Sequence, residues 1–115
     1  MGERFWIQDF ETGLDRLRVH FTTDRGQVVA IIVIQYEAYI DGKWRPVVRF
    51  DETHGFFHRD VVSPSGEQQK TPIAVDDRSE ALAKALYEIR QLWRTYRKTF
   101  EDEYDASKQP EQPHR

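Results

Sequence analysis

The sequence has 115 residues, of which 38% are hydrophobic and 32% are charged, and its formal net charge is −3. This length fits one small domain. The absence of cysteine excludes disulfides, cysteine-ligated zinc, iron–sulfur clusters and thiol catalysis. No apolar run approaches the roughly 20 residues of a membrane-spanning helix, and the charged N-terminus does not match a signal peptide. We therefore expect a cytoplasmic protein without a membrane partner.

The negative charge is concentrated at the C-terminal end. Residues 101–115 hold five acidic and two basic side chains, so residues 1–100 are neutral overall. A neutral domain has no global basic field to attract nucleic acid. From residue 105 onward the chain contains two prolines among charged and amide residues, with too little apolar area to order it. We predict one domain over residues 1–104 and a disordered acidic tail over residues 105–115.

Two alternating segments come first along the chain. Residues 14–22 alternate between apolar and polar side chains, which predicts a half-buried strand. Residues 28–40 predict a long strand whose first half is apolar on both faces, as in the centre of a sheet. The side chains of the first strand that we expect in the core are Leu17, Val19 and Phe21.

A hairpin connects this long strand to the next one. Asp41-Gly42 is a strong signal for a type I′ turn, which requires positive φ at both central residues. The partner strand covers residues 44–51, but Pro46 lacks an amide donor. A simple two-residue turn would also pair Ile34 with Arg49, an apolar with a charged side chain. Both observations predict that the second strand is an edge at Pro46 or contains a bulge.

The remaining segments complete the predicted fold. Residues 56–62 and 70–75 are further short strands, and at Asp77 the apolar period changes from two to 3.6. Asp77 with Glu80 forms a capping box at the start of a helix. We therefore expect an α+β fold in which an antiparallel β-meander of about four or five strands packs against one long C-terminal α-helix. The helix stripe that would face the sheet contains Leu82, Ala85, Leu86, Ile89, Leu92, Trp93, Tyr96 and Phe100.

One segment, residues 49–60, concentrates side chains that could carry chemistry. It contains two of the four histidines, two arginines and three carboxylates. In an extended chain, His54, His58 and Asp60 would share one face, and Arg59 would lie on the other. The candidate catalytic residues are His54 and His58, the candidate substrate-binding residues are Arg49 and Arg59, and the supporting residues are Asp51 and Asp60.

Three interpretations of this segment are open. Metal-free cleavage of a phosphodiester would use one imidazole as general base and the other as general acid, with an arginine on the phosphate. A metal site would use His54, His58 and a carboxylate of Asp51 or Asp60, but an extended chain separates the two histidines by about 13 Å, so it needs a turn at Gly55. In a purely structural role, Asp51 caps a turn, His58 satisfies a buried partner, and Arg59 pairs with Asp60 or Glu52. We expect no metal and no cofactor.

The motif carries two resemblances. The run from Asp51 to Asp60, with the pattern D-x-x-H-G-x-x-H-R-D, resembles a family of short uncharacterised prokaryotic proteins over roughly residues 13–100. More distantly, the chain is similar to the TumE-like toxins of bacterial toxin–antitoxin pairs. This second resemblance implies a small protein that acts on RNA and binds an antitoxin. The corresponding positions are Phe50, Asp51, Gly55, His58 and Arg59.

Two functions of different classes follow. The first is a toxin-type protein with metal-independent ribonuclease-like activity, in which His54 and His58 transfer protons and Arg49 and Arg59 bind phosphate. The second is a protein-interaction or regulatory module without catalysis. It would offer a hairpin to a partner or form a homodimer through a sheet edge. The aromatic side chains of that hairpin are Tyr36, Tyr39 and Trp44.

Overall fold

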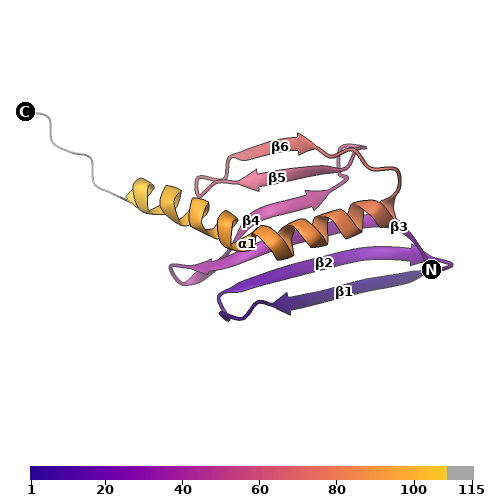
Figure 1. Cartoon of the computed structure of the whole chain (residues 1–115), viewed down its shortest axis with the longest axis horizontal. Coiled ribbons are helices and arrows are strands. Elements are labelled where there is room, and N and C mark those ends of the chain that lie inside the picture. The colour runs from indigo at the N-terminus through magenta and orange to yellow at the C-terminus, as the bar shows by residue number, and fades with distance from the viewer. Residues whose placement is uncertain (109–115) are drawn as a thin grey trace, which may run out of the picture.

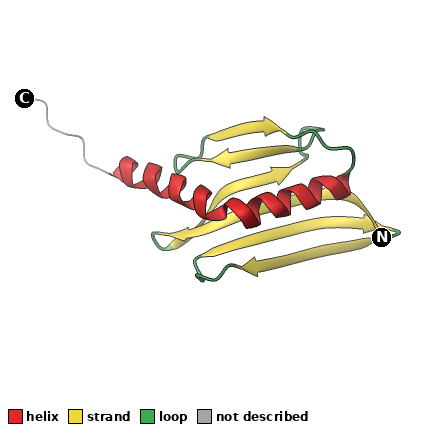
Figure 2. Cartoon of the chain, viewed as in Figure 1, coloured by secondary structure: helices red, strands yellow, loops and turns green. Residues whose placement is uncertain are grey.

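The computed structural model describes residues 1–108 and confirms the α+β fold, with six strands where four or five were expected. All six strands form one antiparallel sheet in chain order, and one helix, α1, crosses a single face of it (Figures 1 and 2). In the described part of the chain the opposite face carries no helix, and it is called the outer face below. The elements are β1 (Gly2–Asp9), β2 (Asp15–Asp24), β3 (Gln27–Ile40), β4 (Lys43–Asp51), β5 (His58–Val62), β6 (Gln68–Pro72) and α1 (Arg78–Lys108).

Tight turns set the register of the central hairpins. Asp41 and Gly42 have φ values of 53° and 83°, which confirms the predicted type I′ turn between β3 and β4. Arg25 and Gly26 repeat this geometry between β2 and β3, with φ values of 52° and 78°. These turns keep consecutive strands adjacent, so the sheet order equals the chain order.

The hairpin of β3 and β4 contains the predicted bulge. The pairing shifts between Tyr36 and Glu37, so that Ile34 lies opposite Phe50 and not opposite Arg49. This shift restores an apolar pair on the helix side of the sheet. The pairing of β4 with β5 covers Val48 to Asp51 only. Pro46 therefore lies where β4 has a neighbour on one side, as its missing amide donor requires.

The core lies between the sheet and α1. Trp93 stacks on Phe10 with a centroid separation of 5.0 Å and also contacts Tyr36, which is fully buried. The predicted strand residues Leu17 and Val19 are completely buried against this layer. The buried residues of α1 are Ala81, Ala85, Ile89, Trp93 and Phe100, all at helical spacing on one stripe.

A buried ion pair joins α1 to the start of β2. Arg97 Nη1 donates to Asp15 Oδ1 at 2.6 Å, and the Asp15 side chain is only 1% exposed. The same carboxylate accepts hydrogen bonds from Tyr36 Oη and Thr12 Oγ1, each at 2.5 Å. Burial and then the hydrogen bond to Asp15 raise the pKa of Tyr36. Arg97 also donates to the carbonyl of Leu14, so its guanidinium binds the β1–β2 turn to the helix.

Three boundaries differ from the sequence prediction. β1 was not expected, because its segment mixes charged and apolar side chains without clean alternation. The helix continues to Lys108, four residues beyond the predicted end of the domain, and the rest of the predicted tail lies outside the described residues. The strands expected at 56–62 and 70–75 instead begin at His58 and Gln68, and the second ends at Pro72. Within residues 1–108, no helix combines the length and apolarity needed to cross a bilayer, and the cytoplasmic location stays a prediction.

Candidate functional site

The hairpin between β4 and β5 brings three of the candidate residues together on the outer face. Asp51 and His58 are directly opposite in the register, and Asp60 lies two residues further along β5 on the same face. His58 Nε2 is 2.9 Å from Asp51 Oδ1 and 3.3 Å from Asp60 Oδ2. The three residues are buried, and one ligand atom from each lies within 4.8 Å of the others. We call them the Asp51–His58–Asp60 cluster.

A tight loop shapes this hairpin. Gly55 has a φ of 85°, and its amide donates to the carbonyl of Glu52 at 3.1 Å. The backbone amide and hydroxyl of Thr53 both donate to Asp51 Oδ1, at 3.1 and 2.8 Å. Residues 52–57 therefore form a turn and not the extended chain that the alternation argument assumed. Asp51 caps this turn, as the structural interpretation predicted.

Because of this turn, the two histidine rings are neighbours. The centroids of His54 and His58 are 5.8 Å apart, and the Phe56 ring is 5.2 Å from that of His58. His54 is exposed, whereas only 1% of His58 is exposed. The paired imidazoles that the sequence suggested are thus brought together, with His54 facing solvent above a buried His58.

The hydrogen bonds of His58 define what its ring can do. Its Nδ1 is 3.1 Å from the carbonyl oxygen of Phe56, an acceptor that holds the proton on Nδ1. In the neutral ring, the lone pair of Nε2 then faces the carboxylates of Asp51 and Asp60. Such an arrangement requires a positive charge between them, either a proton on Nε2 or a bound cation.

Neighbouring strands supply further charges. Lys70 on β6 lies opposite Asp60 and donates to its Oδ1 at 2.9 Å. Arg49 on β4, the strand that flanks β5 opposite to β6, is the other register partner of Asp60. The Nε of Arg49 donates to Gln35 Oε1 at 2.7 Å. The sequence reasoning missed Lys70 and Gln35, since only the register places them beside the cluster.

Next to the cluster, the outer face is hollowed over β2, β3 and β4. The hollow has a volume of about 350 Å³, and Asp51 belongs to both the hollow and the cluster. Arg18 and Arg49 supply two cationic side chains to its wall. Within residues 1–108, the contacts of Arg49 leave its two terminal nitrogens without a hydrogen bond. The full lining is Arg18, Ile32, Val33, Gln35, Arg49 and Asp51.

Arg59 does not join this site. Its neighbour Phe50 in the register faces the helix, and Arg59 Nη1 pairs with Glu88 of α1 at 2.8 Å. The prediction that Arg59 shares a phosphate site with Arg49 is therefore wrong, and so is its expected pairing with Asp60 or Glu52. Alternation along β5 explains this result, because consecutive residues of a strand point to opposite faces.

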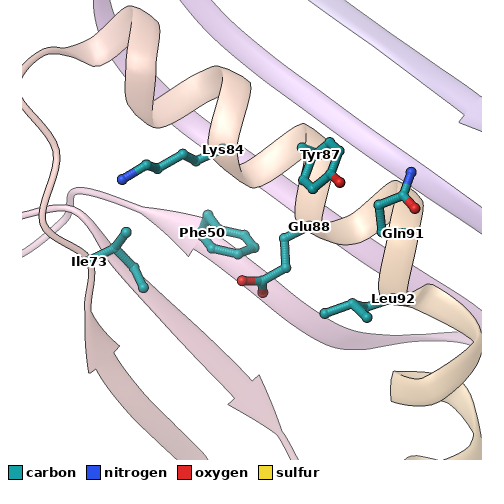
Figure 3. A pocket seen from close by; sticks show the side chains of 7 residues that line it. All are labelled: Phe50, Ile73, Lys84, Tyr87, Glu88, Gln91 and Leu92. Atoms are coloured by element: carbon teal, nitrogen blue, oxygen red, sulfur yellow. The ribbon is translucent and has the colours of Figure 1, made fainter.

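The helix side of the sheet has its own groove, beside α1. Figure 3 shows Phe50 of the sheet and Glu88 of the helix among the side chains that line it. The groove has a volume of about 490 Å³ and is mainly apolar. Tyr96 donates to Glu88 at 2.7 Å, and burial and then this hydrogen bond raise the pKa of Tyr96. Glu88 is thus engaged by Arg59 and Tyr96, and the groove lies on the face opposite to the Asp51–His58–Asp60 cluster.

The hairpin suggested as a partner-binding surface is only partly accessible. Tyr36 is fully buried in the core, so it cannot contact a partner. Tyr39 and Trp44 remain at the surface and contact each other with a centroid separation of 5.3 Å. The guanidinium of Arg16 covers the Trp44 ring at 4.0 Å.

Comparison with known proteins places the chain in a family without adding a function. Neither curated proteins nor solved structures gave a significant match. The resemblance to TumE-like toxins and the wider D-x-x-H-G-x-x-H-R-D pattern stay predictions. The family model described as a domain of unknown function, DUF7718, matches residues 1–106, and the chain belongs to that family.

Proposed function

We propose that the outer face binds a divalent cation at the Asp51–His58–Asp60 cluster and uses it to act on a phosphodiester of RNA. The observation that carries this proposal is the buried Nε2 of His58, which lies within 3.3 Å of two carboxylates. A shared cation would compensate all three groups at once, and one imidazole with two carboxylates suits zinc or manganese.

The two distances from His58 to the carboxylates fit such an ion. Two ligands at about 2.1 Å from a metal, separated by 90° to 109°, lie about 3.0–3.4 Å from each other. The separations of 2.9 and 3.3 Å between His58 Nε2 and the two carboxylates are close to this range. His58 and Asp60 are held through their far polar atoms, by the Phe56 carbonyl and by Lys70. Thr53 holds Asp51 through Oδ1, the same oxygen that faces His58.

The hollow beside Asp51 supports a substrate with phosphate groups. A cation at the cluster would be reached through Asp51, because this ligand also lines the hollow. Arg18 and Arg49 can contact phosphate oxygens there, and a guanidinium binds them with two parallel hydrogen bonds. His54, exposed next to His58, is the group that can give a proton to a leaving oxygen. The cation, when bound, would polarise the phosphate and activate water.

Cation binding is tested first. Titration of the chain with Mn²⁺ or Zn²⁺, measured by calorimetry, should show one binding site. Asp60→Asn keeps the shape of the side chain and should weaken binding at least tenfold. His20→Asn is the matched control, because His20 pairs with Glu3 on the same face but lies outside the cluster. Wild-type protein that binds neither ion at millimolar concentration would refute the cation site.

Cleavage is tested separately with a labelled single-stranded RNA. Wild-type protein should cleave it and lose activity with a chelator, and His54→Ala should lose activity while it still binds the cation. Cleavage that persists in chelator would instead support metal-free catalysis by the two histidines. Induced expression in a bacterial host, with soluble amounts matched, should arrest growth for the wild type and not for Asp60→Asn. Cation binding without RNA cleavage or growth arrest would refute the RNA function and keep the site.

A further inference from the structure

The two edges of the sheet differ in how they are protected against another strand. β6 has five residues, is polar throughout, ends at Pro72 and carries Lys70. Proline and lysine are the usual means of blocking an exposed edge. β1 has eight residues with neither proline nor lysine, and it pairs with β2 over its whole length without a register shift. Among residues 1–108, β1 is therefore a regular edge that remains open to strand addition.

The free backbone groups of β1 can be assigned. The amide of Phe10, directly after β1, donates to the carbonyl of Asp15 at 2.9 Å. Backbone groups alternate in direction along an antiparallel strand, so the even-numbered residues of β1 face β2. The amides and carbonyls of Glu3, Phe5 and Ile7 therefore point away from the sheet.

Two neighbouring side chains of the same face of this edge, between the charged Glu3 and Asp9, are apolar and exposed. Phe5 is 55% exposed and Ile7 is 45% exposed, both on the outer face. Their cross-strand neighbours in β2 are His20 and Arg18, which leave the apolar side chains uncovered on the outward side. An added strand would bury both side chains and pair the free backbone groups at once.

We propose that β1 binds β1 of a second copy of this chain, antiparallel, with Phe5 opposite Phe5 on the two-fold axis. In this register, Glu3 lies opposite Ile7 and Arg4 lies opposite Trp6, so no like charges face each other. Arg4 and Trp6 form a cation–π pair twice by symmetry. Moving the axis to Trp6 would place Glu3 opposite Asp9 twice, which the repulsion of two carboxylates disfavours.

This register makes a residue-level prediction that the absence of cysteine makes easy to test. Residues opposite each other in a hydrogen-bonded pair have Cα atoms about 5.5 Å apart, within the range of a disulfide. Under mild oxidation, Phe5→Cys should form a covalent dimer. Ile7→Cys is the matched control and should remain reduced, since its opposite residue is Glu3. Equal crosslinking of both variants would overturn the register.

Self-association is measured by sedimentation equilibrium on the chain without an N-terminal tag. The mass of the wild type should rise with concentration from 13.7 kDa toward twice that value. Phe5→Lys should raise the dimer dissociation constant at least tenfold, because it places two lysines on the axis. Gln69→Lys, at the β6 edge, should leave it unchanged. A monomeric wild type up to millimolar concentration, or a dimer disrupted only by Gln69→Lys, would overturn the proposal.

Discussion

Replacing Arg97 with methionine should strongly destabilise the protein. The substitution keeps the aliphatic stem of the side chain and removes the guanidinium that neutralises Asp15, which is 1% exposed. A buried ion pair that loses one partner costs about 3–5 kcal/mol. Thr12 and Tyr36 still donate to Asp15, so the lower end, about 3 kcal/mol, is expected. At about 4 °C per kcal/mol, the melting temperature should fall by about 12 °C or more.

Urea unfolding followed by circular dichroism measures this loss, with an unchanged m-value as the sign that only stability has altered. Lys98→Met is the matched control, since Lys98 is the next residue of α1 and its pair with Asp102 is exposed to solvent. That variant should unfold like the wild type. In Asp15→Asn/Arg97→Met the loss should be smaller than the sum of the single losses. If Arg97→Met unfolds at the same urea concentration as Lys98→Met, the buried pair does not stabilise the fold.

Three further predictions concern stability. Burial raises the pKa of Tyr36 above its value in the unfolded chain, so the contribution of this residue to the free energy of unfolding should be constant below about pH 10. Above that pH the free energy of unfolding should fall by about 1.4 kcal/mol per pH unit, and in Tyr36→Phe, measured by urea unfolding at alkaline pH, it should fall less steeply. Asp77→Ala removes the acceptor of the Glu80 amide at the start of α1 and should cost about 1 kcal/mol by urea unfolding, whereas an unchanged midpoint would contradict the cap. Gly55→Ala should cost about 1–2 kcal/mol in thermal unfolding, because Gly55 has a φ of 85° and an added Cβ would meet no atom within 4 Å, so the cost comes from the backbone alone. Gly55→Asn should cost less, and an equal loss for both variants would argue against backbone strain.

Most of the fold follows from local sequence patterns. The alternation over residues 14–22 predicts a strand, and Asp41-Gly42 predicts a turn, and the structure confirms both. Each pattern depends only on residues close together in the chain. The N-cap at Asp77 is equally local. β1 escapes prediction because only Trp6 of its aromatic residues turns toward the core, where it contacts Phe21. An edge strand buries too little of its surface to impose a clear pattern.

The candidate site is less local, and its prediction is correspondingly partial. The sequence motif predicts Asp51, His58 and Asp60 as candidate site residues. Alternation along the strand places Arg59 on the face opposite to His58 and Asp60. The contact of His58 with both carboxylates depends on the loop of residues 52–57. Glu52 fixes that loop by accepting the amide of Ile31, 21 residues away, at 2.8 Å. No pattern along the chain encodes such a contact.

The buried carboxylate of Asp15 had a visible signal in the sequence. It occupies the same face of its strand as Leu17 and Val19, an unusual place for an acid in a protein core. A buried acid requires a cationic or hydrogen-bonding partner. That partner, Arg97, lies 82 residues away in the sequence, and the position where α1 crosses the sheet brings it to Asp15.

The position of α1 at the end of the described chain also affects how the protein is made on a ribosome. All six strands precede the helix, so the apolar face of the sheet is complete before its cover has been synthesised. At about 5–20 residues per second, the 31 residues of α1 take about 2–6 s to add. During this interval Tyr36 and Phe50 are open to other nascent chains on the same messenger. Slow translation of residues 78–108 should therefore lower the yield of folded protein more than slow translation of the strands.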